Sequence, residues 1–241
     1  TDTLCEGSAA SYTFTCAVSP GFSNPSFQWQ QSFNGGPFTD ITGATNTTLV
    51  QNFLTTAAAG TYTFRLSAAE AGNMSSALCR VVSPLITIQV EKNPVTTVTG
   101  ISPVCERGVL SMAATGGSQY QWNGPAAFSS TSDVVTISNA QVSQSGKYYV
   151  LVSNAAGCNH LDSITVMVNP SPTASTSFST ADLCEGDTLQ LLGSGGTIYT
   201  WQPSAGLSSS VLSNPLAFPL SSVLYSVIVG NSFNCTDTAT I

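Results

Sequence analysis

Apolar and polar residues alternate with a period of two along most of the chain, which predicts short β-strands. The clearest runs are residues 62–66, 134–137, 148–152 and 225–229. Glycine, asparagine, serine and proline separate such runs, and no stretch keeps the period of an amphipathic helix. About seven short strands in each unit of this size are typical of a two-sheet sandwich. The pattern therefore predicts an all-β chain.

The predicted strands belong to a motif that occurs three times: Cys-Glu, then an aromatic-x-Trp segment, a strand led by tyrosine, and a second cysteine. Its second and third copies are offset by 77 to 79 residues, and a longer version opens the chain. Such a period indicates tandem domains. We expect three immunoglobulin-like β-sandwiches in an extended array, over residues 1–93 with enlarged loops, 94–170, and 171–241, the last ending within its final strand. The copies contain Cys5, Trp29, Tyr62 and Cys79; Cys105, Trp122, Tyr148 and Cys158; and Cys184, Trp201, Tyr225 and Cys235.

The first two predicted domains end at Asn93-Pro94 and Asn169-Pro170, which lie 76 residues apart. Proline cannot donate to a strand ladder and favours an extended conformation in the preceding residue. We expect each Asn-Pro pair to act as a short, stiff joint.

Charge excludes several classes of partner. Charged residues make up 7% of the chain and the net charge is −7, with no cluster of lysine or arginine. Nucleic acid and anionic membranes attract basic patches, so neither is an expected partner. No apolar run reaches the ~18 residues of a membrane span, which argues against direct membrane insertion. Because no signal peptide opens the sequence, we expect a piece of a longer exported protein.

The seven cysteines predict three disulfides and one free thiol, Cys16, which alternates in phase with the apolar Tyr12 and Phe14. Paired cysteines in small domains indicate an oxidising, extracytoplasmic compartment. Zinc is the alternative, but no Cys-x2-Cys occurs and His160 is the only histidine. Each copy of the motif has a first and a second cysteine, and we expect the two to bond within the copy: Cys5 with Cys79, Cys105 with Cys158, and Cys184 with Cys235.

Bridges of this kind would clamp each domain from its entrance to its exit. On the chain-entropy model each closed loop contributes around 4 kcal/mol. Tension would then cross each bridge, and the residues between Cys105 and Cys158 would carry little load. Reduction would release about 190 Å of contour length per repeat.

Gly60-Thr61-Tyr62 and Gly146-Lys147-Tyr148 resemble the turn before strand F of immunoglobulin domains, where the tyrosine hydroxyl bonds back to the chain. More specifically, the chain resembles the tandem immunoglobulin-like and PKD-like repeats of Bacteroidetes surface and secreted proteins, including gliding-motility adhesins exported by type IX secretion. The residues that carry this resemblance are Trp29-Gln30-Gln31-Ser32, Gly195-Gly196 before Tyr199-Thr200-Trp201, and Asn234-Cys235-Thr236-Asp237.

The resemblance implies a non-enzymatic stalk or adhesive segment at the bacterial cell surface or outside the cell. Its expected partners are a surface polymer, glycan or protein target and neighbouring domains of the same longer chain. The alternative is a carbohydrate-binding accessory region of a secreted polysaccharide-degrading enzyme.

Few residues are candidates for a catalytic, metal-binding or ligand-binding role. His160 and Asp162 share a strand face, but no nucleophile motif accompanies them, and exposed polar residues are the favoured interpretation. Asp182, Glu185 and Asp187 are either solvated turn carboxylates or a calcium site at a joint. No other cofactor is expected. Phe33 and Phe38, which flank Asn34-Gly35-Gly36, are candidate ligand contacts, with loop packing as the alternative.

Overall fold

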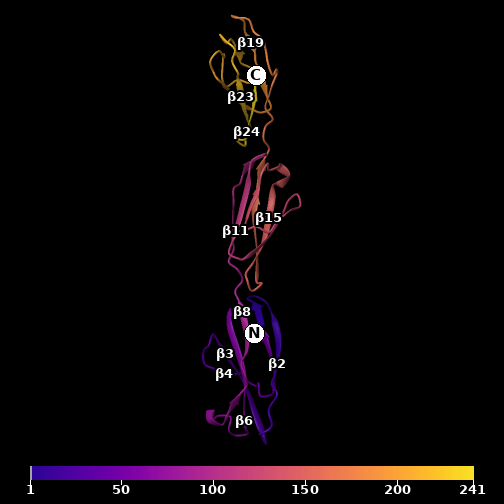
Figure 1. Cartoon of the computed structure of the whole chain (residues 1–241), viewed down its shortest axis with the longest axis vertical. Coiled ribbons are helices and arrows are strands. Elements are labelled where there is room, and N and C mark those ends of the chain that lie inside the picture. Colours follow the sequence, from indigo (N-terminus) through magenta and orange to yellow (C-terminus); the bar gives the residue numbers. More distant parts are fainter. Residues whose placement is uncertain (1) are drawn as a thin grey trace. The chain divides into compact units, whose positions relative to one another are not determined.

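The computed structural model describes residues 2–241, and Figure 1 labels its strands along the chain. The chain divides into two compact units. The first unit holds the chain up to Thr96 together with Gly116–Gln119 and Leu151–Leu161; the second holds the rest. Within the described residues every regular element is a β-strand, apart from two short 3-10 turns. The all-β prediction is confirmed, and the strands form immunoglobulin-like sandwiches.

Strands of the first repeat form two sheets, one of order β1-β8-β6-β3-β4 with β7 beside β6, and one of β2 and β5. Trp29 is fully buried between them with Phe14, Phe64 and Val90. Its indole nitrogen donates to the carbonyl oxygen of Asn46 at 2.9 Å. The strands are β1 (Asp2–Cys5), β2 (Ala10–Thr15), β3 (Pro25–Phe33), β4 (Thr39–Asp40), β5 (Thr48–Phe53), β6 (Gly60–Glu70), β7 (Val81–Val82) and β8 (Ile86–Glu91), with the 3-10 turn η1 (Ala77–Cys79).

The second repeat forms a sheet of order β14-β11-β9, a sheet of order β13-β12-β15-β16, and a parallel pair of β10 and β17. Trp122 and Tyr148 are fully buried in it. The strands are β9 (Thr97–Gly100), β10 (Val104–Cys105), β11 (Leu110–Thr115), β12 (Gln119–Gly124), β13 (Phe128–Ser130), β14 (Val134–Ile137), β15 (Gly146–Ser153), β16 (Asn159–Val166) and β17 (Val168–Asn169), with the 3-10 turn η2 (Val142–Gln144).

In the third repeat the main sheet has the order β21-β23-β24, and two short strand pairs, β18 with β20 and β19 with β22, face it across a core around Trp201. The strands are β18 (Ser175–Thr176), β19 (Leu189–Gln190), β20 (Gly193–Ser194), β21 (Ile198–Gln202), β22 (Leu216–Ala217), β23 (Ser226–Gly230) and β24 (Thr236–Thr240). The domain limits 1–93, 94–170 and 171–241 stay a prediction.

The tyrosine turns differ between repeats. The Tyr62 hydroxyl donates to the Ala58 carbonyl at 3.1 Å, and Tyr148 donates to Gln144 at 2.9 Å. Both bonds reach back four residues, as the immunoglobulin resemblance implies. Tyr225 instead donates to the Ala205 carbonyl at 2.8 Å, 20 residues back along the chain.

Each Cys-Glu segment opens a tight turn. The backbone nitrogens of Ser8, Gly108 and Asp187 donate to the carbonyl oxygens of Cys5, Cys105 and Cys184 at 3.0, 2.9 and 3.1 Å. The third turn residue has a positive φ each time, at Gly7, Arg107 and Gly186. In the first two repeats the cysteine also ends a strand that runs parallel to the exit strand, with Cys5 opposite Glu91 and Cys105 opposite Asn169.

Candidate functional site

The cysteines pair across repeats rather than within them. One disulfide joins Cys5 to Cys158 and another joins Cys105 to Cys235, with Cα atoms 5.4 and 5.6 Å apart. The first cysteine of a repeat therefore bonds the second cysteine of the next repeat. The predicted pairs Cys5–Cys79, Cys105–Cys158 and Cys184–Cys235 are wrong, and Cys79 and Cys184 are exposed and unbonded.

Cys5 and Cys79 lie at opposite ends of the first sandwich, which explains why their predicted pairing is wrong. Cys5 lies beside Glu91, at the end of β8 that pairs with the start of β6, where Gly60 faces Val90. Cys79 lies in the loop after β6, beyond Glu70. The 11 residues of β6 separate the two places by roughly 33 Å at a rise of about 3.3 Å per residue. A disulfide needs Cα atoms within about 7 Å, so Cys5 cannot reach Cys79 in this fold.

The hairpins that carry Cys158 and Cys235 are built alike. Asn154 and Asn231 each begin a five-residue turn that ends in the cysteine, and each accepts a backbone bond from that cysteine at its side-chain oxygen, at 3.0 and 3.1 Å. The fourth residue, Gly157 or Asn234, adopts a positive φ that few side chains tolerate. The turn thus fixes the direction of each cysteine.

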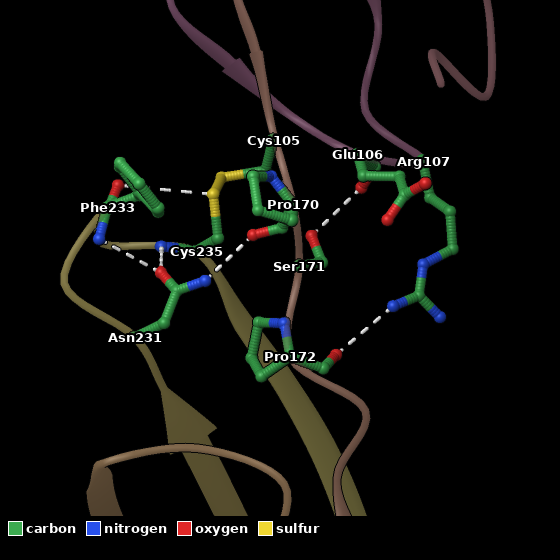
Figure 2. The surroundings of a disulfide bond; sticks show 9 residues. All are labelled: Cys105, Glu106, Arg107, Pro170, Ser171, Pro172, Asn231, Phe233 and Cys235. Carbon is green, nitrogen blue, oxygen red and sulfur yellow. Dashed lines mark hydrogen bonds between the residues drawn. A yellow bond between two sulfur atoms is a disulfide. The ribbon is translucent and has the colours of Figure 1, made fainter. Parts of the chain in front are cut away.

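The same asparagines also tie the hairpin to the linker between repeats. The side-chain nitrogen of Asn154 donates to the carbonyl oxygen of Lys92 at 2.9 Å, and that of Asn231 donates to Pro170 at 2.7 Å. Figure 2 shows the second of these bonds beside the Cys105–Cys235 disulfide. One side chain therefore shapes the turn and holds it against the chain that enters the repeat.

The linker is held to the Cys-Glu turn as well. Asn93 donates to the carbonyl oxygen of Glu6 at 3.0 Å, and the Ser171 hydroxyl donates to that of Glu106 at 3.0 Å (Figure 2). The next residues, Pro94 and Pro172, are both buried. Asn93-Pro94 is thus equivalent to Ser171-Pro172 rather than to Asn169-Pro170, so the predicted match of the two Asn-Pro pairs is off by two residues.

Two further contacts complete the joints. The Arg107 guanidinium donates to the carbonyl oxygen of Pro172 at 3.2 Å (Figure 2). A Cβ atom added to Gly116 would lie 1.9 Å from the Val95 carbonyl oxygen, and one added to Gly195 would lie 1.9 Å from that of Thr173. Only glycine allows the linker to pass this close. Sequence reasoning missed both glycines as joint residues, although their spacing of 79 residues repeats.

The remaining candidate residues lie at exposed or half-buried positions. His160 is exposed on β16, and Asp162, on the same strand, accepts a bond from its neighbour Ser163. Asp182, Glu185 and Asp187 are exposed, and no group of three metal-ligating side chains gathers among residues 2–241. The calcium alternative therefore has no ligand cluster there. Cys16 is unbonded and half-buried against the first core.

Phe33 and Phe38 both make packing contacts. The Phe33 ring lies 4.8 Å from that of Tyr62 and lines a hollow of about 290 Å³, while the Arg65 guanidinium covers Phe38 at 3.9 Å from its centroid. The two planes of Phe33 and Tyr62 meet at 50°, so they form no flat platform for a sugar. Ligand contact at these residues stays a prediction.

One family model and several solved structures are similar to this chain. Residues 1–92 match the family model described as a domain of unknown function (DUF8696). No curated protein sequence matches the chain.

Three solved structures illustrate the likeness. The chain is similar to the N-terminal eight immunoglobulin domains of Down Syndrome Cell Adhesion Molecule, at 12% identity and a TM-score of 0.45, covering 99% of this chain and 34% of that one. It is similar to Sidekick-1 immunoglobulin domains 1–5 at 16% identity and a TM-score of 0.42, covering 99% and 55%. It is also similar to three domains of the bacteriophage RB49 outer capsid protein Hoc, at 13% identity and a TM-score of 0.36, covering 98% and 93%.

Proposed function

We propose that the chain is a structural or adhesive segment of an exported surface protein, in which disulfides lock each repeat to the next. The observation that carries this proposal is the repeated joint, with one disulfide, one bifunctional asparagine and one close-packed glycine at each of two places. Two independent joints of the same design favour a fixed connection between repeats over a flexible tether. A bacterial cell surface is the proposed location, on the resemblance to Bacteroidetes repeats.

The two disulfides interleave along the sequence, and this determines how the chain can be stretched. They create two covalent junctions, Cys5 with Cys158 and Cys105 with Cys235. Three segments connect these junctions, and the shortest has 53 residue steps, from Cys105 to Cys158. That segment limits full extension. The earlier expectation that it is shielded from load is therefore reversed.

The composition and the bonds suit this role. Disulfides persist in oxidising compartments outside the cytoplasm. Within residues 2–241, no helix has the length and apolar character needed to cross a membrane. Only 7% of the residues are charged, so the solubility of the chain rests on neutral polar side chains. The excess of acidic over basic residues disfavours binding to nucleic acid.

Single-molecule pulling from the two termini tests the proposal. Without reductant, the shortest covalent path between the termini limits extension to about 240 Å, taking ~3.6 Å per residue step. With reductant the whole chain should extend to about 860 Å, a gain of roughly 600 Å. An unchanged contour length after reduction would contradict the proposed role.

A matched variant distinguishes the observed pairing from bridges within repeats, because both pairings give similar lengths in the intact chain. The C79S/C184S double variant removes the two unbonded cysteines. Its contour length without reductant should equal that of the unaltered chain. A clear lengthening would show that Cys79 or Cys184 carries load.

Carbohydrate binding by the first repeat is the second candidate, since Phe33 is 42% exposed beside a hollow. A glycan array probed with the full chain and with F33A tests it. Binding that F33A abolishes would favour this function over a purely structural one.

A further inference from the structure

Cys184 begins the same turn as the two cysteines that form joints. The backbone nitrogen of Asp187 closes the turn onto the Cys184 carbonyl at 3.1 Å, and Gly186 has a φ of +89°. At Cys5 and Cys105 the equivalent turns are closed in the same way, and both sulfur atoms bond a hairpin cysteine from the following repeat. Cys184 has no such bond and is exposed.

The surroundings of Cys184 also lack the strand that flanks the other two. In the first and second repeats, exit-strand residues Glu91 and Asn169 lie opposite the cysteine in a parallel pair. No described strand pairs with Leu183 or Cys184. In its place is a groove of about 370 Å³, lined by Leu183, Cys184, Leu220, Tyr225 and Ile241 among others. Leu220, which lines this groove, is 94% exposed.

We propose that this groove with Cys184 is a third joint, which takes a further immunoglobulin-like repeat that follows in tandem. The occupant has two parts: an extended segment that leads into that repeat and pairs in parallel with Leu183–Cys184, as the exit strands β8 and β17 pair beside Cys5 and Cys105, and a hairpin of the form Asn-x-x-x-Cys within that repeat. The order of the partners comes from the two formed joints, where the hairpin always belongs to the later repeat. This inference rests on the proposed function and extends it to a specific partner.

The bond would form by an ordinary thiol oxidation. The Cys184 thiol and the hairpin thiol together lose two protons and two electrons, and one sulfur–sulfur bond forms. The electrons pass to a low-molecular-weight disulfide such as oxidised glutathione, which leaves as two thiols. The asparagine of the hairpin would donate to the linker, as Asn231 does to Pro170.

The test extends the full chain after Ile241 with a second copy of residues 165–241, which keeps the 77-residue spacing of Cys158 and Cys235. The extended chain is folded in a glutathione buffer, its free thiols are alkylated, and its peptides are mapped without reduction. Cys184 should be bonded to the copied Cys235, with the Cys105–Cys235 bond unchanged. Alkylated Cys184, a bond to the original Cys235, or a bond to Cys79 of another molecule would overturn the proposal.

The matched control carries Ser at the copied Cys235 only, and Cys184 should then be alkylated fully. A second measurement covers failure of the extension to fold. A peptide of residues 225–241, supplied as its glutathione mixed disulfide, should exchange onto Cys184 of the 241-residue chain at least tenfold faster than onto Cys79, which is also exposed. Equal exchange rates at Cys184 and Cys79 would show that the groove does not bind the peptide specifically, and would overturn the proposal.

The two proposals fail in different ways. If pulling shows no lengthening on reduction, the proposed function as a disulfide-locked structural segment is wrong. If pulling shows the expected lengthening while Cys184 stays free in the extended chain, only the third joint is wrong.

Discussion

The side-chain oxygen of Asn154 accepts a hydrogen bond from the backbone nitrogen of Cys158 at 3.0 Å, while its side-chain nitrogen reaches the carbonyl of Lys92. Asn231 makes the same two kinds of contact beside Cys235. A single amide therefore couples the geometry of the hairpin to the path of the linker. Aspartate could accept the first bond but could not donate the second.

Replacing Asn231 with alanine should loosen the second joint. The backbone nitrogens of Phe233 and Cys235 lose their acceptor and the Pro170 carbonyl loses its donor. We expect a loss of about 1–3 kcal/mol in the free energy of unfolding, measured in urea. Reduction of the Cys105–Cys235 bond by dithiothreitol should be several times faster. N123A, at an exposed strand position, is the control and should change neither quantity.

The pairing of cysteines can be mapped directly. Peptides separated without reduction should contain Cys5 with Cys158 and Cys105 with Cys235, and C5S should leave Cys158 available for alkylation. Because Cys79 and Cys184 are unbonded, C79S and C184S should leave both bonds in place. A peptide joining Cys105 to Cys158 would contradict the structure.

Alanine at Gly195 should destabilise the second joint. The added Cβ would lie 1.9 Å from the Thr173 carbonyl oxygen, and the φ of +109° is one that alanine rarely adopts. G72A separates the two effects, since Gly72 has a φ of +89° with no atom within 4 Å of an added Cβ. Strain alone should cost about 1 kcal/mol in G72A, and G195A should cost clearly more in the same urea titration. Equal losses would show that the close approach is unimportant.

Tyr148 should make stability sensitive to alkaline pH. Burial raises the pKa of the Tyr148 hydroxyl above its usual value of 10.0, because the neutral phenol is favoured in the core. The unfolded phenol loses its proton near pH 10, whereas the folded one keeps it to higher pH. The stabilisation is therefore complete below about pH 10 and is lost as the pH rises through the folded pKa.

Y148F provides the measurement. At about pH 8 it should lower the free energy of unfolding by roughly 1–2 kcal/mol, because the bond to Gln144 is lost. Above about pH 10 the gap between Y148F and the unaltered chain should shrink, with tryptophan fluorescence as the probe and free thiols blocked. A constant gap across this range would argue against the raised pKa.

Much of the fold follows from local pattern. Alternation and turn residues are enough to indicate strands, and the recurrence of Trp29, Trp122 and Trp201 correctly marks three buried core positions. The tyrosine turns at Tyr62 and Tyr148 follow from their Gly-x-Tyr sequences. The changed partner of Tyr225 could not be read from sequence, because it depends on a loop contact with Ala205 that is 20 residues away.

The joints were harder to predict for a topological reason. Repeat matching sorts the cysteines into two equivalent sets, but a bond within a repeat and a bond to the next repeat satisfy that matching equally well. Strand direction decides between the two kinds of bond. Cys158 lies just before the start of β16, whereas Cys105 pairs with Asn169, beyond the end of that strand, so the two cysteines lie at opposite ends of β16. Placing both cysteines on an immunoglobulin topology, rather than on a period alone, would have separated them.

Interleaved bonding also bears on how the chain survives damage. Any single backbone cut between Cys5 and Cys235 produces two fragments, and at least one of the two bridges always spans the cut. The chain would thus remain one covalent molecule after a first proteolytic cut in this range, whichever loop is cut.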